Sequence, residues 1–288
     1  MSRRRELSRR LAALTDIAGI MSAMKSLALM ETRILRDFLV SQRRMVAGIE
    51  AAAADFLAWH GEFTPGPGTG RELCVLVGSE WGFCGDFNET IVERTRALRA
   101  RTHASARWVL VGQRLSARLG DNPLAALSLP GATIADDVPA VLLRLTGELS
   151  HLLGTQEMAG FGLSTLYHCD ATGDIRLRRL LPLRDLPPPG HVHPYPAELN
   201  LPPAEFLAGL TRHYLYAALN EVLYSSLMAE NRQRLAHMDR ALQRLDENTE
   251  QLRLAYNAQR QEEIVEEIEV ILLSADVLTG EVREAAKS

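Results

Sequence analysis

The 288-residue sequence predicts two long helices, paired as an antiparallel coiled coil, with an α/β domain inserted between them. Residues 1–60 contain no proline and only two glycines. Residues 210–279 contain neither proline nor glycine, so nothing in that stretch breaks a helix. Almost all the remaining glycines and prolines lie between these two segments, where short apolar runs alternate with turns. This distribution predicts three parts, an N-terminal shaft helix (1–60), an α/β globular domain (71–195) and a C-terminal shaft helix (205–288).

The N-terminal part has the spacing of an amphipathic helix. Alanine, leucine, methionine and arginine, which favour helices, dominate its composition. Apolar residues recur at steps of four and three, at Leu7, Leu11, Leu14, Ala18 and Met21. A helix over about residues 3–58 would be roughly 80 Å long.

The C-terminal part begins with heptad spacing. The positions that step by three and four are Leu235, Met238, Leu242, Leu245, Thr249 and Leu252. The step then becomes four repeatedly, at Tyr256, Arg260, Ile264 and Ile268. Such a stutter unwinds a left-handed supercoil. We therefore expect the seam to straighten between Tyr256 and Ile268.

The two helices are expected to pack on each other. A compact domain of about 135 residues has a radius of gyration of about 14 Å. It cannot cover a C-terminal helix over residues 205–282 that would be roughly 115 Å long. Because the helices flank one insert, their directions are expected to be antiparallel. The alternative is that each breaks into a bundle of shorter helices, which the lack of turn signals disfavours.

The middle part has an α/β pattern. Buried strands are predicted at residues 72–77 and 106–112, each followed by a helix, and a further helix at residues 138–153. Two alternating runs, GLSTLYHC and DIRLRRLLPL, are joined by a turn at Gly173 and predict a hairpin. Together they indicate a parallel sheet with an antiparallel edge.

Composition excludes several classes of protein. The net charge of −4 gives no general attraction to nucleic acid or to an anionic membrane. The three cysteines form no CxxC pair, which is typical of buried thiols in a reducing compartment. We see no apolar run near the roughly 18 residues that span a bilayer. The sequence is therefore interpreted as cytosolic or peripheral.

The loop GSEWGFCGDFN, which follows the first strand, is a candidate nucleotide site because glycines there can cradle phosphate. It matches neither GxGxxG nor a P-loop, so Gly82 and Gly85 are assigned to a tight turn. Cys84 is a candidate nucleophile without a nearby His partner. His191 and His193 lack the further ligands of a metal site. No catalytic residue, cofactor or metal is predicted.

Charge is divided between the two ends of the chain. Five arginines lie in residues 1–10, where positive charge opposes the helix dipole, and five glutamates lie in residues 262–269. In an antiparallel pair these segments would lie on the same side, so the glutamates could balance the arginines. For the glutamates themselves, a solvated face is the favoured interpretation, and contact with the arginines or with a basic partner is the alternative.

Four segments resemble the gamma subunit of F-type ATP synthases. IMSAMK (20–25) is similar to the family's ITKAMK stretch, and SEWGFCGDFN to its SDxGLCGxFN loop. AENRQRLAHM (229–238) resembles the SExxARMxAM stretch. LRLAYNAQRQEEIVEEIEVILLSADVL resembles the YNxxRQxxITxEI ending. Val265 and Ser274 depart from the pattern, where the family has Thr and Gly.

The resemblance implies a central rotor stalk that couples ion flow to ATP synthesis or hydrolysis by rotation and catalyses nothing itself. Its partners would be the alpha, beta and epsilon subunits and the c-ring. One copy per complex would lie on the cytoplasmic side of the bacterial inner membrane, bound to no nucleic acid. The resemblance places Met24 and Lys25 near Arg234, Met238 and Gln261.

The implied coupling and interface residues are Met24, Lys25, Arg234, Met238, Gln261, Ile264, Ile268 and Ile271. The surplus of aliphatic residues near Ile271 also indicates a protein interface. Two alternatives remain, an α/β enzyme with a coiled-coil oligomerisation arm and a coiled-coil scaffold. The first requires a catalytic constellation and the second uniform heptads.

Overall fold

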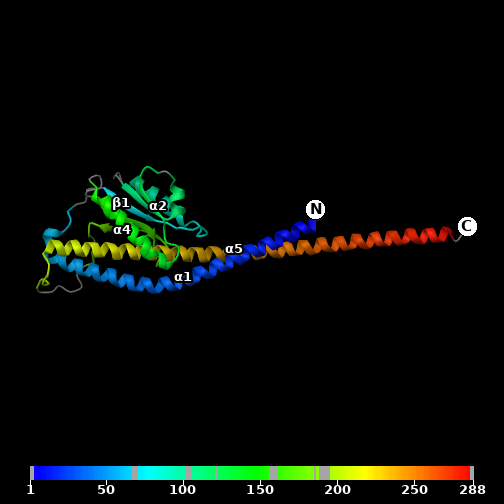
Figure 1. Ribbon diagram of the computed structural model, residues 1–288, viewed down its shortest axis with the longest axis horizontal. Coiled ribbons are helices and arrows are strands. Elements are labelled where there is room, and N and C mark those ends of the chain that lie inside the picture. Colours follow the sequence, from blue (N-terminus) through cyan, green and yellow to red (C-terminus); the bar gives the residue numbers. More distant parts are fainter. Residues whose placement is uncertain are drawn as a thin grey trace. The chain divides into compact units, whose positions relative to one another are not determined.

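Two long helices carry the fold in the computed structural model, which describes residues 3–66, 71–101, 106–120, 122–155, 161–184, 186–187 and 195–285. They are α1 (Arg3–Trp59) and α5 (Pro203–Ala285) (Figure 1). The chain divides into two units. Unit 1 joins Met1–Ser26 with Met238–Ser288, and unit 2 is Leu27–His237. The predicted fold class, an antiparallel helix pair with an inserted α/β domain, is confirmed.

Unit 2 contains a five-stranded sheet with the order β3-β2-β1-β4-β5. Strands β1 (Glu72–Val77), β2 (Ala106–Val111), β3 (Ala125–Leu129) and β4 (Gly162–His168) run parallel to one another. Strand β5 (Ile175–Leu181) pairs antiparallel with β4 and forms one edge, as predicted. Gly173 lies in the turn between them with φ 76°, a conformation that glycine adopts without strain.

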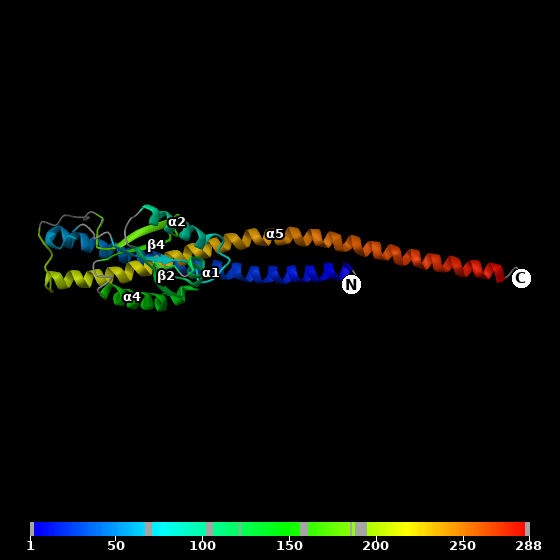
Figure 2. The ribbon, with the colours of Figure 1, turned by 90° about the horizontal axis from the view of Figure 1, so that it is seen from above.

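Both faces of the sheet are covered. Helices α2 (Phe87–Arg101) and α3 (Gln113–Leu119) follow β1 and β2, and Cys74 and Leu76 of β1 belong to the core on their side. Alternate residues Leu73, Val75 and Val77 join a second core with α4 (Val138–Gly154), α1 and α5. Figure 2 shows α2 and α4 on opposite sides of the sheet.

Strand β3 and two short 3₁₀ segments, η1 (Gly61–Phe63) and η2 (Ala135–Asp137), are absent from the sequence prediction. The β3 sequence, AALSL, is short and contains two alanines, which are depleted in strands. It pairs with β2 through a register shift between Trp108 and Val109. Its position is therefore set by tertiary pairing rather than by local propensity.

An ionic cluster attaches the edge hairpin of the sheet to the parts of the long helices α1 and α5 that lie in unit 2. Arg178 of β5 binds Glu50 of α1 at 2.8 Å and Glu221 of α5 at 2.7 Å. Arg43 of α1 pairs with Glu221 at 3.6 Å and with Asp170, which follows β4. Because two cations meet three carboxylates from four segments, the cluster fixes the hairpin against both helices.

One described helix reaches the threshold for crossing a membrane by length and composition alone. Helix α1 contains an 18-residue window of mean hydropathy 1.3, with 6% of that window buried. The expectation that no apolar stretch comes near this threshold is therefore wrong. The many alanines and methionines of α1 raise its mean hydropathy without forming an unbroken apolar run. The core helix of a globular protein and a signal sequence pass the same test, so the window alone assigns no membrane span.

Candidate functional site

Two ion pairs fix the register of the helix pair in unit 1. Lys25 Nζ lies 2.5 Å from Asp239 Oδ1, and Arg4 Nε lies 3.0 Å from Glu263 Oε2. Residue numbers fall along α5 as they rise along α1, so the helices are antiparallel. The Arg4–Glu263 pair also joins the arginine-rich start of α1 to the glutamate-rich segment of α5, while the other four glutamates of that segment are exposed.

The expected proximity of Gln261 to Met24 and Lys25 is wrong. Lys25 is level with Asp239, and Gln261 lies 22 residues further along the same helix. At a rise of 1.5 Å per residue this separation is roughly 33 Å. Gln261 instead lies two residues from Glu263, at the level of the start of α1. Met238, next to Asp239, is fully buried, while Met24 is half-buried.

The seam of unit 1 follows heptad spacing on both helices. Half-buried side chains on α1 lie at the predicted positions Leu7, Leu11, Leu14, Ala18 and Met21. Those on α5 are Leu242, Leu245, Thr249, Leu252, Tyr256, Gln259 and Glu263. The predicted stutter is wrong, because the step after Tyr256 is three and then four. Arg260, Ile264 and Ile268 are exposed instead.

The seam therefore becomes polar where α1 begins. Gln259 and Glu263 occupy heptad positions that leucines occupy earlier in α5. In the described part of the chain α1 starts at Arg3, opposite Glu263, while α5 continues for 22 residues to Ala285. Ile264, Ile268 and Ile271 follow this level with exposed fractions of 44%, 50% and 64%. These isoleucines form an apolar face on α5 outside the seam.

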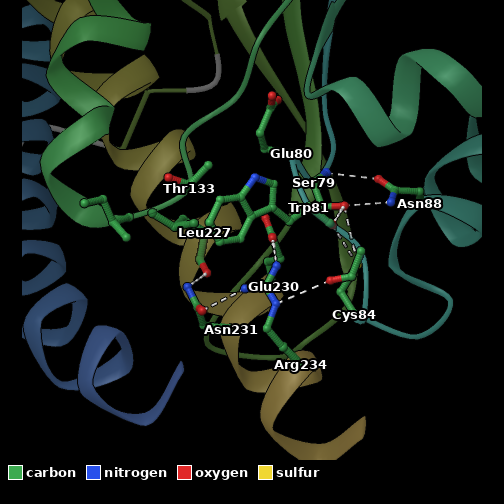
Figure 3. A network of polar contacts seen from close by, with 12 residues as sticks. Ser79, Glu80, Trp81, Cys84, Asn88, Thr133, Leu227, Glu230, Asn231 and Arg234 are labelled. Atoms are coloured by element: carbon green, nitrogen blue, oxygen red, sulfur yellow. Dashed lines mark hydrogen bonds and ion pairs between the residues drawn. The ribbon is translucent and has the colours of Figure 1, made fainter. Parts of the chain in front are cut away.

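A buried polar network in unit 2 surrounds Arg234, another of the predicted interface residues (Figure 3). Its guanidinium forms an ion pair with Glu230, and donates to Asn231 Oδ1 at 2.9 Å and to the Gly82 carbonyl at 3.5 Å. All three α5 side chains are at most 6% exposed. Burial raises the pKa of Glu230 to about 7, although the Arg234 charge acts to lower it. The network links α5 to the loop after β1.

That loop is organised by Ser79 and Asn88. The Ser79 backbone N–H donates to Asn88 Oδ1 at 3.0 Å, and Asn88 Nδ2 donates to Ser79 Oγ at 2.8 Å. Cys84 donates to the same hydroxyl, and burial raises the pKa of its thiol. A protonated, buried thiol is a poor nucleophile, which agrees with a structural assignment. Trp81 and Phe83 of this loop are exposed by 57% and 58%.

The family of the chain follows from a comparison with known proteins. The family model described as ATP synthase matches residues 3–278. The chain belongs to this family.

Curated relatives of this ATP synthase family chain are gamma chains. The ATP synthase gamma chain of Clostridium pasteurianum is 25% identical, with 94% of this chain and 96% of the relative covered. That of Methylobacterium sp. (strain 4-46) is 24% identical, with 95% and 99% covered.

Solved structures share the fold. The central stalk and c-ring structure of the Tetrahymena thermophila mitochondrial ATP synthase has a similar chain, with a TM-score of 0.58 and 16% identity. The match covers 77% of this chain and 99% of that one. A chain of the Euglena gracilis mitochondrial ATP synthase has a TM-score of 0.61 at 14% identity, with 96% and 94% covered.

Sequence reasoning missed two members of the network in this ATP synthase chain, Glu230 and Asn231. The signal was available, because both residues lie in AENRQRLAHM, the segment that resembles the family pattern, directly after the buried stretch Val222–Ala229 of α5. Among the described residues no group of three metal-ligating side chains is found. His191 and His193 lie outside the described residues.

Proposed function

We propose that this protein is the central rotor stalk, the gamma subunit, of an F-type ATP synthase. The observation that carries the proposal is the antiparallel helix pair of unit 1 together with the exposed isoleucines of α5. Ile264, Ile268 and Ile271 follow Glu263, which pairs with Arg4, and all three are exposed. Apolar side chains at the end of a long helix are the surface that a surrounding protein ring would contact.

The proposed partners are the alpha and beta subunits, which would surround the C-terminal end of α5. Epsilon and the c-ring would instead contact the α/β domain. The similar structures are a mitochondrial central stalk with its c-ring and a mitochondrial ATP synthase rotor. One copy per complex would be attached peripherally to the cytoplasmic side of the bacterial inner membrane. Coupled to ion transport, it would drive ATP synthesis or be driven by ATP hydrolysis.

The proposed mechanism requires no chemistry from this chain. A shaft without rotational symmetry makes different contacts with each of three surrounding catalytic sites. A difference in contact free energy between conformations shifts each site between its states. Rotation of the shaft would then pass the sites through those states in turn, and the subunit itself would be non-catalytic.

Each part of the chain has a proposed task. Residues 1–60 and 205–288 would form the shaft, and residues 71–195 would be the domain that meets epsilon and the c-ring. Within the shaft we assign coupling and interface roles to Met24, Lys25, Arg234, Met238, Gln261, Ile264, Ile268 and Ile271. Lys25 and Met238 support such a role through the register of the seam, and the isoleucines through their exposure.

The experiment is reconstitution with the alpha and beta subunits of an F-type ATP synthase from the same organism. The full chain, labelled at an exposed residue of α2 such as Glu93, is expected to co-purify with alpha and beta and to rotate when ATP is added. Rotation should stop when ATP is withheld. A chain that forms a stable homo-oligomer and ignores both subunits would contradict the proposal and favour a scaffold.

A further inference from the structure

The α/β domain contains a cavity of about 240 Å³ between α2 and the sheet. Its floor follows two rows of paired residues across the strands. One row is Trp108, Cys74 and Ser164, and the next contains Leu76, Leu166 and Leu177. Thr95, Leu98 and Arg99 of α2 line the other side.

The cavity exists because small side chains lie where larger ones could fill the space. Cys74 and Ser164 are adjacent on the floor, and Ala106 precedes Trp108 by two residues on the same face of β2. The neighbouring row, by contrast, is made of leucines. An apolar cavity of about 150 Å³ is large enough to bind benzene. A volume of about 240 Å³ accommodates a short alkyl chain or a fused ring.

Charge at the rim determines the head group. Glu72 is the acidic lining residue, and Arg179 neutralises it with an N–O distance of 2.6 Å. Arg179 pairs across the strands with Ser164, so it lies at the end of the floor row. Arg99 lines the cavity and makes no ion pair with any described residue. Two cations and one anion leave a net positive charge at the rim.

We propose that this cavity binds an alkyl monocarboxylate of medium chain length. The chain would lie against Trp108, Leu76 and Leu166, and the carboxylate would lie at the rim beside Arg99. The proposal is independent of the rotor function, because no residue of the two shaft helices, α1 and α5, lines the cavity. Its failure would leave the rotor assignment unchanged.

The test uses the fluorescence of Trp108, which lines the cavity and is 5% exposed. In the full chain carrying Trp59→Phe and Trp81→Phe, Trp108 is the remaining tryptophan. Titration with octanoate is expected to change its emission saturably. Because each buried methylene strengthens binding about fourfold, hexanoate should bind roughly fifteenfold more weakly. Absence of a saturable change would overturn the proposal.

Matched variants separate the cavity from other surfaces. Ser164→Leu fills the cavity and is expected to abolish the response, while Ser128→Leu, the same change on β3 outside the cavity, should preserve it. Ala106→Leu fills the cavity from β2 and replaces Ser164→Leu as the test if that variant misfolds by circular dichroism. A response that survives in the folded cavity-filling variant would overturn the site.

The head group is tested separately. Arg99→Gln should weaken octanoate binding about two- to fivefold, the size expected for an exposed ion pair, whereas Arg96→Gln on the same helix should not. Octanol and octylamine should bind more weakly than octanoate. Equal affinity for all three would overturn the assignment of a carboxylate.

Discussion

At the scale of single residues, the pair formed by Glu230 and Arg234 is the most informative feature. Both side chains are at most 7% exposed, so each depends on the other for compensation of its charge. Replacing Arg234 with methionine is expected to lower the free energy of unfolding by about 3–5 kcal/mol, because it leaves a buried carboxylate unpaired. Urea denaturation followed by circular dichroism measures this change.

The double variant Glu230→Leu, Arg234→Met is the control. Removing both charges should restore most of the lost stability, since an apolar pair of similar volume needs no compensation. If the double variant were as unstable as Arg234→Met alone, packing rather than charge would explain the loss.

The raised pKa of Glu230 leads us to expect that the stability of the protein depends on pH. The pKa is about 7 in the folded chain, against an ordinary value of 4.5. Between these values the folded state binds more protons than the unfolded state, so this group's contribution is complete below pH 4.5 and is lost as pH rises through 7. Glu230→Gln should remove this fall in the free energy of unfolding. Denaturation of the unsubstituted chain and of Glu230→Gln at several pH values between 4.5 and 8 tests this prediction. If the free energy of unfolding depended on pH in the same way in both proteins, the prediction would be contradicted.

At the scale of elements, the sequence predicted well where propensity and pattern agree. Both long helices, four of five strands and the Gly173 turn were predicted from breakers and alternation. Strand β3 was not, because its AALSL sequence has weak strand propensity and it pairs with β2 through an irregular register. The predicted course of the seam was wrong after Tyr256, because the prediction assumed that the seam positions would be apolar. In the structure polar residues keep the heptad, and the isoleucines lie outside it.

The polar end of the seam gives a prediction for α5. Gln259→Leu places an apolar side chain at a half-buried heptad position and is expected to stabilise the helix pair by about 1 kcal/mol. Hydrogen exchange of the amides in residues 3–14 and 252–263 should slow accordingly. Arg260→Leu is the matched control and should have no effect, because Arg260 is exposed. Stabilisation by Arg260→Leu but not by Gln259→Leu would instead support the predicted stutter, which places Arg260 in the seam.

At the scale of the whole molecule, substitution of an exposed isoleucine of α5 should affect function without affecting the stability of the isolated chain. Ile268 lies outside the seam and is 50% exposed, so Ile268→Asp should change the free energy of unfolding of the isolated chain by less than about 0.5 kcal/mol. In the complex the same change would bury a charge against the partner ring. We expect ATP hydrolysis to continue while ion pumping falls.

Glu266→Asp is the control for this experiment, since Glu266 is exposed and already carries a negative charge. It should leave both pumping and hydrolysis unchanged. Unchanged coupling in Ile268→Asp would remove this segment of α5 from the proposed contact with the catalytic ring.

The antiparallel pairing of α1 with α5 also constrains how the protein is made. Helix α1 ends at Trp59, but its partner begins only at Pro203 and the residue that meets Arg4 is Glu263. At a synthesis rate of about 5–20 residues per second, α1 waits roughly 10–40 s on the ribosome before its partner is complete. During that time its apolar seam is open to water and to other nascent chains. The antiparallel pairing therefore leaves the α1 seam without its partner during most of translation.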